Sequence, residues 1–352
     1  MKRYKKGSEE RKPLFVGIDL HRLRWQVTIR TEDVEIFNGS MPGRWEALQR
    51  VLERHGQYAI QVVYEAGYFG FWLHDRLGEA GFECIVTPPS LLPMEYGNRV
   101  KTDRRDSRKL AQLLAKGLLK RVWVPSLEER YHRQVIRRRR QLIGDRVRTQ
   151  NRIKAELRLY GIELPEAVGK WSKAYVVNLT RLQFNNRYMQ ESFGRLLEEY
   201  EFLSQQILKQ TKLLQDLAET ELYRQRVAIL QSLPGVGLIA AMELLLELQD
   251  VARFRRAEDL AAYVGLTPAQ YSSAEKIRMG RITAIGKNAL RGTLVEVAWR
   301  FIGKDASVRR TYERIKVRAG SKRAIVAIAR RVLLMSRRML LDNRPYQIRR
   351  AA

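Results

Sequence analysis

Leu14-Phe15-Val16-Gly17-Ile18-Asp19-Leu20-His21 is a short apolar run that carries one carboxylate near its end. Its length and its apolar residues are typical of a buried β-strand, and Asp19 lies where such a strand would leave the core. A carboxylate there is costly to bury unless a positive group pairs with it. The alternative is a turn or cap residue, because an Asp side chain often hydrogen-bonds the local backbone.

The charge of the chain indicates a polyanionic partner. The sequence has 352 residues, enough for two or three domains, and a formal net charge of +28. Residues 99–160 hold 20 basic and 6 acidic residues, and residues 300–352 hold 16 basic and 3 acidic ones. Two segments therefore carry nearly all of the excess charge, which is typical of proteins that bind nucleic acid.

An anionic membrane is the second candidate partner, and the sequence argues against it. No apolar run approaches the length of a membrane span, and residues 14–18 are too short for a signal peptide. The single cysteine, Cys84, excludes an internal disulfide framework. We therefore expect a reduced, cytoplasmic protein, associated with the nucleoid, that has no membrane partner.

Residues 13–125 alternate between strand and helix patterns. Before them, residues 1–12 are charged and predict a flexible arm. Short alternating apolar runs around Val27 and Val34 predict a meander after the first strand. Further strands are expected at 59–65 and 82–86, and helices at 44–55 and 69–80. This alternation predicts an α/β domain with a mixed sheet.

Four carboxylates lie at the ends of predicted elements. Asp19 and Glu65 each end a strand, and Asp103 and Asp106 lie in the first turn of a predicted helix. Residues three apart share a helix face, so both aspartates can point the same way, whereas capping explains only one of them well. Such ends converge at one edge of an α/β sheet. Divalent cations such as Mg²⁺ prefer carboxylate oxygens, and bound metals assist phosphoryl transfer.

The middle of the chain predicts two long helices. Residues 127–160 form a helical pattern rich in arginine, and apolar residues from Phe193 to Leu217 recur at alternating spacings of three and four. The second pattern is typical of a coiled coil. We expect the two helices to pair, either as a hairpin within the chain or across a dimer. We also expect the arginines to contact phosphate rather than to form only a solvated face.

The C-terminal part predicts further helices and one polar loop. Residues 228–248 predict two helices joined at Leu233–Gly237, which resemble a helix-hairpin-helix; a plain helical turn is the alternative. A polar loop carrying Ser272 and Ser273 is expected before Thr283. Serine in such a loop is usually a turn residue, and otherwise a nucleophile. From Gly286 the pattern is helical and rich in arginine.

Taken together, these motifs resemble the DEDD insertion-sequence transposases. That family includes the Piv-type DNA invertases and the bridge-RNA-guided recombinases. The resemblance rests on four segments in the same order: Phe15–Asp19, Tyr64–Gly67, Lys101–Asp106 and the region from Leu233 to Thr283. It spans nearly the whole chain.

The resemblance implies a RuvC-like, RNase H-fold domain at 13–125. It also implies an Arg-rich helical coiled coil at 126–225 and a mostly helical transposase domain with the helix-hairpin-helix at 226–352. It implies a nucleophilic serine that matches Ser273, with Ser272 as the alternative. It further implies Mg²⁺ held by Asp19, Glu65, Asp103 and Asp106.

The partners that the resemblance implies are donor and target DNA, a noncoding bridge RNA, and further copies of the chain in dimers that assemble into a tetramer. We therefore expect a DNA recombinase that uses the carboxylates together with Ser273. The alternative is a metal-dependent nuclease or Holliday-junction resolvase without serine chemistry. A third interpretation is a structural protein that binds nucleic acid without catalysis.

Overall fold

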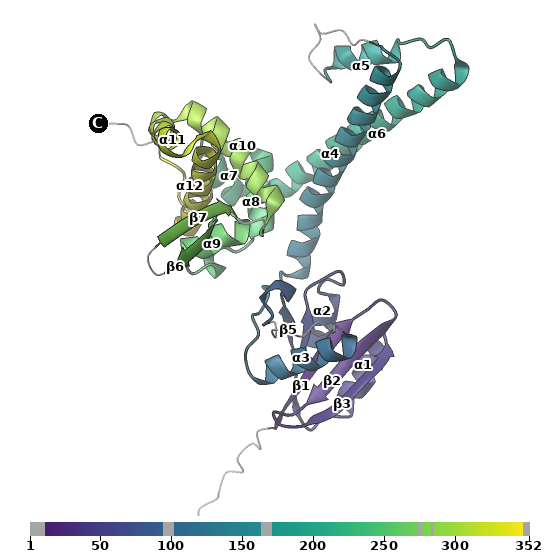
Figure 1. The fold of residues 1–352 in the computed structure, drawn as a ribbon, viewed down its shortest axis with the longest axis vertical. Coiled ribbons are helices and arrows are strands. Elements are labelled where there is room, and N and C mark those ends of the chain that lie inside the picture. The colour runs from purple at the N-terminus through teal and green to yellow at the C-terminus, as the bar shows by residue number, and fades with distance from the viewer. Residues whose placement is uncertain (1–10, 94–101, 163–170, 274–275, 283–284, 348–352) are drawn as a thin grey trace, which may run out of the picture. The chain divides into compact units, whose positions relative to one another are not determined.

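The computed structural model describes residues 11–93, 102–162, 171–273, 276–282 and 285–347, without the side chains of 271–279. The chain divides into two units, Met1–Pro125 and Ser126–Ala352 (Figure 1). Residues 1–10 of the predicted arm lie outside the described residues. Among the helices that the structure describes, none is long and apolar enough to cross a membrane.

A mixed sheet forms the centre of the first unit. In the described residues it has five strands in the order β3-β2-β1-β4-β5. β1 pairs antiparallel with β2, as β2 does with β3, whereas β4 runs parallel to β1 and to β5. The predicted α/β unit with a mixed sheet and a meander is therefore confirmed. The strands are β1 (Pro13–Leu20), β2 (Arg24–Arg30), β3 (Glu35–Pro42), β4 (Ala59–Glu65) and β5 (Glu83–Thr87).

The two faces of β1 belong to two different apolar layers. Leu14, Val16 and Ile18 pack with helices α1 (Trp45–Glu53) and α2 (Trp72–Glu79). Phe15 packs with α3 (Asp103–Ala115), which lies along β1 and β2. Because side chains alternate along a strand, the next odd-numbered residues, Gly17 and Asp19, belong to the α3 face.

Helix α3 is anchored to the sheet along one side. Ser107, Leu110, Ala111 and Leu114 are buried, which is the spacing of a single helix face. The buried hydroxyl of Ser107 forms a 2.9 Å hydrogen bond with that of Thr28 on β2, so both polar groups are satisfied. These contacts fix the first turn of α3 near the end of β1.

Two long helices begin the second unit. α4 (Leu127–Leu159) starts with a capping box formed by Ser126 and Glu129, and α6 (Arg187–Ala218) packs along it. Thr149 donates a hydrogen bond to Glu199, and Arg139 donates one to Thr211, so the helices run antiparallel. Both predicted helices are present, and they pair within one chain. Helix α5 (Lys173–Thr180) packs against them.

Shorter helices complete the second unit around α8, which is buried on nearly all sides. Their core also contains Ile136 of α4 and Leu214 of α6. The predicted boundary at residues 225 and 226 falls inside α7, and the described units do not divide there. These helices are α7 (Arg224–Gln231), α8 (Leu238–Leu248), α9 (Ala257–Val264), α10 (Asn288–Lys304), α11 (Ala306–Ala319) and α12 (Ser321–Asp342).

The turn between α7 and α8 is built around Gly235. This glycine has φ +96°, and a Cβ atom on it would lie 3.0 Å from the carbonyl oxygen of Val297 and 3.1 Å from the amide nitrogen of Phe301. The positive φ and the close packing against α10 therefore both favour glycine here, independently of any phosphate. The predicted pair of helices is present, and its binding of phosphate remains a prediction.

The segment with the two serines is a β-hairpin, so the expected polar loop is wrong. β6 (Pro268–Ser273) pairs antiparallel with β7 (Lys276–Ile282). The alternation of apolar and basic residues after Lys276 is a strand pattern that the polar composition obscured. Two glycines pack together at the base of the hairpin: a Cβ atom on Gly286 would lie 2.7 Å from the amide nitrogen of Gly265.

Candidate metal centre

Asp19 and Glu65 follow neighbouring positions on two parallel strands. The register of β1 and β4 pairs Ile18 with Tyr64, and each carboxylate is the next residue along its strand. Alternation places both on the face that α3 covers. Both residues are partly buried. The parallel register therefore brings two of the four predicted carboxylates to one edge of the sheet.

The other two predicted carboxylates, those of Asp103 and Asp106, lie in the first turn of helix α3. It begins at Asp103, which is exposed, and its first turn also holds Asp106, which is partly buried. Negative charges in the first turn are favourable there by about 0.3–1 kcal/mol each, because the N-terminus of a helix carries partial positive charge. The position of Asp103 depends on the packing of α3 against the sheet.

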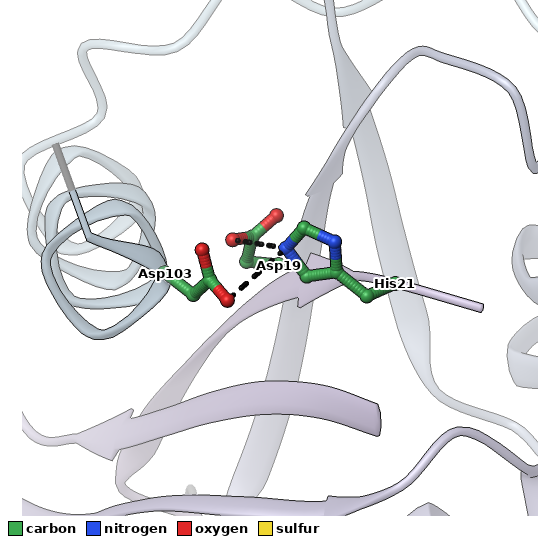
Figure 2. A group of neighbouring side chains, drawn as sticks. All are labelled: Asp19, His21 and Asp103. Carbon is green, nitrogen blue, oxygen red and sulfur yellow. Dashed lines mark hydrogen bonds and ion pairs between the residues drawn. The ribbon is translucent and has the colours of Figure 1, made fainter. Parts of the chain in front are cut away.

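A histidine joins Asp19 to Asp103 (Figure 2). The Nε2 atom of His21 lies 3.2 Å from Oδ2 of Asp19 and 3.4 Å from Oδ2 of Asp103. One ligand atom from each of the three residues lies within 4.8 Å of the other two. Sequence reasoning missed His21, although its distance of two residues from Asp19 is the spacing that keeps side chains on one side of an extended chain.

Burial and like charges oppose the ionisation of Asp19. Burial raises the pKa of its carboxyl above the usual range, and the nearby charges of Asp103 and Asp106 act in the same direction. The charge and hydrogen bond of His21 oppose this effect. A cation bound among these carboxylates would favour their charged forms.

The donor set fits a divalent metal ion. Carboxylate oxygens are the ligands that Mg²⁺ and Ca²⁺ prefer, and imidazole nitrogen suits the transition metals. Two carboxylates and one imidazole are therefore compatible with several divalent ions and do not select one of them. Asp19, His21 and Asp103 are the residues that could hold the ion directly.

The structure does not bring Glu65 and Asp106 into this group. Among the described residues, only the ligand atoms of Asp19, His21 and Asp103 meet the 4.8 Å limit together. Asp106 is nevertheless close enough for its charge to act on Asp19.

Ser273 belongs to the second unit. It is the last residue of β6, and its backbone pairs with Lys276 of β7. The side chains of Ser272 and Ser273 lie outside the part of the chain that the structure describes. The role of either serine therefore remains a prediction.

Two transposase family models match the chain. A DEDD transposase model matches residues 16–162, which include all four predicted carboxylates. The transposase IS116/IS110/IS902 family matches residues 227–313, which include the hairpin with Ser273. The DEDD transposase domain is RNase H-like, in agreement with the mixed sheet of the first unit.

Relatives of the chain carry related names. "Putative transposase y4qE" of Sinorhizobium fredii is 30% identical over 338 residues, which cover 93% of this chain and 81% of that protein. The transposase for insertion sequence element IS1533 of Leptospira borgpetersenii is 28% identical, covering 68% of this chain and 71% of that protein. The pilin gene-inverting protein of Moraxella bovis is 30% identical over 130 residues, or 35% of this chain and 39% of that protein.

Proposed function

Since the chain belongs to the IS116/IS110/IS902 family of transposases, enzymes that cleave and join DNA strands, we propose that it recombines DNA by metal-assisted serine chemistry. The proposed nucleophile is Ser273. The proposed ligands of Mg²⁺ are Asp19, Glu65, Asp103 and Asp106.

The metal part of the proposal rests on the position of His21 between two carboxylates. Asp19 lies near the end of β1 and Asp103 begins α3, which is far away in the sequence, yet both carboxylates lie within 3.4 Å of the same nitrogen of His21. The cost of gathering like charges around the partly buried carboxylate of Asp19 is understandable if a cation occupies the site. When bound, the ion would stabilise negative charge on the attacking or departing oxygen of a phosphodiester. Glu65 and Asp106 would complete the oxygen ligands or orient bound water.

The first unit is proposed to be a RuvC-like domain. The support is the strand order β3-β2-β1-β4-β5 together with carboxylates after neighbouring positions of β1 and β4. For the long helices we propose a coiled coil, on the support of the repeated apolar positions of α6. The turn at Gly235 is proposed to be a helix-hairpin-helix.

The serine step exchanges one phosphodiester for another. The Oγ atom of Ser273 forms a bond to the scissile phosphorus, the bond from phosphorus to one DNA oxygen breaks, and the serine proton ends on that departing oxygen. A DNA hydroxyl then attacks the serine phosphodiester, joins a new strand and returns the proton to serine. Support comes from the resemblance and from the position of Ser273 in the segment that the family matches.

The proposed partners are donor and target DNA and a noncoding bridge RNA. Two basic segments, 99–160 and 300–352, carry nearly all of the +28 net charge and suit polyanionic strands. Base pairing would then supply sequence choice, as in other guided systems. We propose that dimers assemble into a tetramer, in which a metal site and a serine of different subunits act together, and that the protein works in the cytoplasm at the nucleoid.

The test separates carboxylate chemistry from serine chemistry. Strand exchange by the full-length protein is measured with Mg²⁺, and covalent protein–DNA adducts are trapped in denaturant and mapped by mass spectrometry. We expect the adduct on Ser273, no adduct or strand exchange for Ser273→Ala, and retained activity for the matched control Ser272→Ala. We expect Asp103→Asn to abolish cleavage.

Two results would contradict the proposal. Wild-type strand exchange by Ser273→Ala would overturn the serine mechanism and leave the chemistry to the carboxylates alone. Full activity of the double variant Glu65→Gln/Asp103→Asn would overturn the metal site.

A further inference from the structure

A cationic cavity lies between α4 and the start of α10, within the second unit. Its volume is about 750 Å³. Five cationic side chains and two carboxylates, those of Asp145 and Glu247, line it, so its lining has an excess of positive charge. Its cationic side chains are Arg137, Arg138, Arg140, Arg148 and Lys287.

Buried carboxylates of α8 hold three of these cations in place. Glu247 is 3% exposed and accepts hydrogen bonds of 2.9 and 3.1 Å from Arg137. The Nζ atom of Lys287 lies 3.6 Å from the same carboxylate. Glu243 is 4% exposed and pairs with Arg140. Because Glu247 neutralises only one of its two cationic partners, Arg137 and Lys287 together keep a surplus positive charge. Side chains that are already held in place lose little conformational entropy when they bind an anion.

Two further arginines of the cavity are exposed and can bind an anionic ligand. Arg138 is exposed and makes no ion pair or hydrogen bond with any other residue that the structure describes. Arg148 pairs with Asp145 on the same helix, but its side chain is 64% exposed. Exposed pairs of this kind contribute little to stability, so an incoming anion can displace the carboxylate at low cost.

The backbone keeps the cavity open. Gly144 lines it from the interior of α4, a helix of 33 residues, where glycine is less favourable than alanine. A Cβ atom there would meet only Arg148, at 3.6 Å, so close packing does not require the glycine. The first turn of α10, Asn288–Leu290, lines the opposite side. Its amides are donors at the positive end of a helix.

The spacing of the cations suits a chain of phosphates. Arg137, Gln141, Gly144 and Arg148 follow one face of α4, and about 16 Å of helix separates the first from the last. Successive phosphates of one strand lie farther apart than the rise of about 3.4 Å per nucleotide along a duplex axis, so about two or three phosphates fit along this length. Guanidinium groups bind phosphate oxygens with two parallel hydrogen bonds, as they bind carboxylates, and a run of phosphates can meet several of these groups at once.

We propose that this cavity binds the phosphodiester backbone of a nucleic-acid strand at the base of the hairpin that carries Ser273. Gly286 and Lys287 line the cavity, and Gly286 packs against Gly265, which shortly precedes β6. The strand is a recombining DNA or the guide RNA, so its identity rests on the proposed function.

The test measures binding by the full-length protein with metal removed by chelator. Fluorescence anisotropy is recorded with a short single-stranded DNA, an RNA of the same sequence and a DNA duplex over a series of salt concentrations. The variant Arg138→Ala/Arg148→Ala removes two charges from the cavity. Its control, Arg187→Ala/Arg195→Ala, removes two exposed charges from α6, outside the cavity and outside both basic segments.

The salt dependence distinguishes a site from general charge. Each phosphate contact contributes about 0.7–0.9 to the slope of log affinity against log salt. We expect the cavity variant to lose about tenfold in affinity and to flatten this slope by about 1.4–1.8 for at least one probe, and the control to keep the wild-type slope. The probe that changes identifies DNA or RNA as the ligand. Equal flattening by the control, or no flattening by the cavity variant with any probe, would overturn the inference.

A second variant separates binding from folding. Gly144→Glu places a carboxylate one turn before Arg148, where it can pair with that arginine, and glutamate forms helices better than glycine. For this variant we expect an unchanged or higher Tm together with weaker binding. Wild-type affinity and slope in Gly144→Glu would contradict the proposal. Since these assays need neither metal nor strand exchange, failure of the catalytic proposal would leave their outcome unaffected.

Discussion

Gly17 of β1 packs against the backbone of Ala111 of α3, so closely that a Cβ atom on Gly17 would lie 2.5 Å from the Ala111 amide nitrogen. This contact sets the distance between the strand that ends near Asp19 and the helix that begins at Asp103. The geometry of the candidate metal centre therefore depends on a residue that has no side chain.

Gly17→Ala is expected to destabilise the first unit and to weaken the metal centre together. The added methyl group forces α3 away from β1, and overpacking of this kind costs about 1–3 kcal/mol. The measurements are urea unfolding and calorimetric titration with a divalent ion. The control is Gly78→Ala on α2, where a Cβ atom meets nothing within 4 Å. This control substitution should stabilise the folded protein by up to about 1 kcal/mol. Equal stability of the two variants would refute this packing argument.

Asp19→Asn is expected to raise the Tm of the metal-free protein while abolishing its response to metal. The substitution removes a partly buried charge that lies near Asp103 and Asp106. Ligand that binds only the folded state raises Tm, so Mg²⁺ should stabilise the wild type and not the variant. Thermal unfolding with and without Mg²⁺ tests this, with the exposed Asp33→Asn as control. An undiminished Mg²⁺ response in Asp19→Asn would speak against the site.

Glu35→Gln is expected to remove a pH-dependent contribution to stability. Arg108 of α3 donates hydrogen bonds of 2.6 and 2.8 Å to Glu35 on β3, and they hold the pKa of Glu35 below its usual value. The contribution is therefore present above the unfolded-state pKa and is lost as pH falls through the folded-state pKa. Because the pair is partly exposed, its size is about 0.5 kcal/mol.

Chemical unfolding at neutral and acidic pH measures this contribution. The free energy of unfolding of the wild type should exceed that of Glu35→Gln at neutral pH, and this difference should vanish at acidic pH. Glu32→Gln, at an exposed position nearby, serves as control, and its free energy of unfolding should equal that of the wild type at both pH values. A difference that persists in acid would assign the effect to something other than the charge of Glu35.

Arg137→Ala is expected to cost about 2–4 kcal/mol, since among the described residues it leaves the buried carboxylate of Glu247 with one ion pair, to Lys287 at 3.6 Å. Replacing both partners, as in Arg137→Met/Glu247→Leu, should cost much less than the sum of the single changes. A double-mutant cycle from urea unfolding measures the coupling. Additive effects would show that the two side chains do not stabilise each other.

Gly286→Ala is expected to reduce formation of the covalent DNA adduct. Gly286 has φ +118°, which favours glycine, and a Cβ atom there would collide with Gly265 at the base of the hairpin. The matched control is Gly292→Ala on α10, where a Cβ atom meets nothing within 4 Å. Adduct yield on labelled DNA is the measurement. Equal yields from both variants would mean that the base of the hairpin does not position the serine.

The sequence by itself determined the elements of the site. Apolar periodicity located β1, β4 and the two long helices, and it placed Asp19, Glu65, Asp103 and Asp106 at the ends of elements. These features depend on neighbours along the chain, which a sequence displays directly. The hairpin at Pro268–Ile282 was missed because its basic and polar residues hid a strand alternation of the same local kind.

The tertiary structure alone decided which of these residues meet. Only packing brings His21 to Asp103, and only the absence of a side chain at Gly17 lets α3 approach β1. The run of arginines in α4 was visible in the sequence, but its buried partners on α8, Glu243 and Glu247, were not. Such contacts join residues far apart in the chain, and their distances follow from how whole elements pack, which no local pattern records.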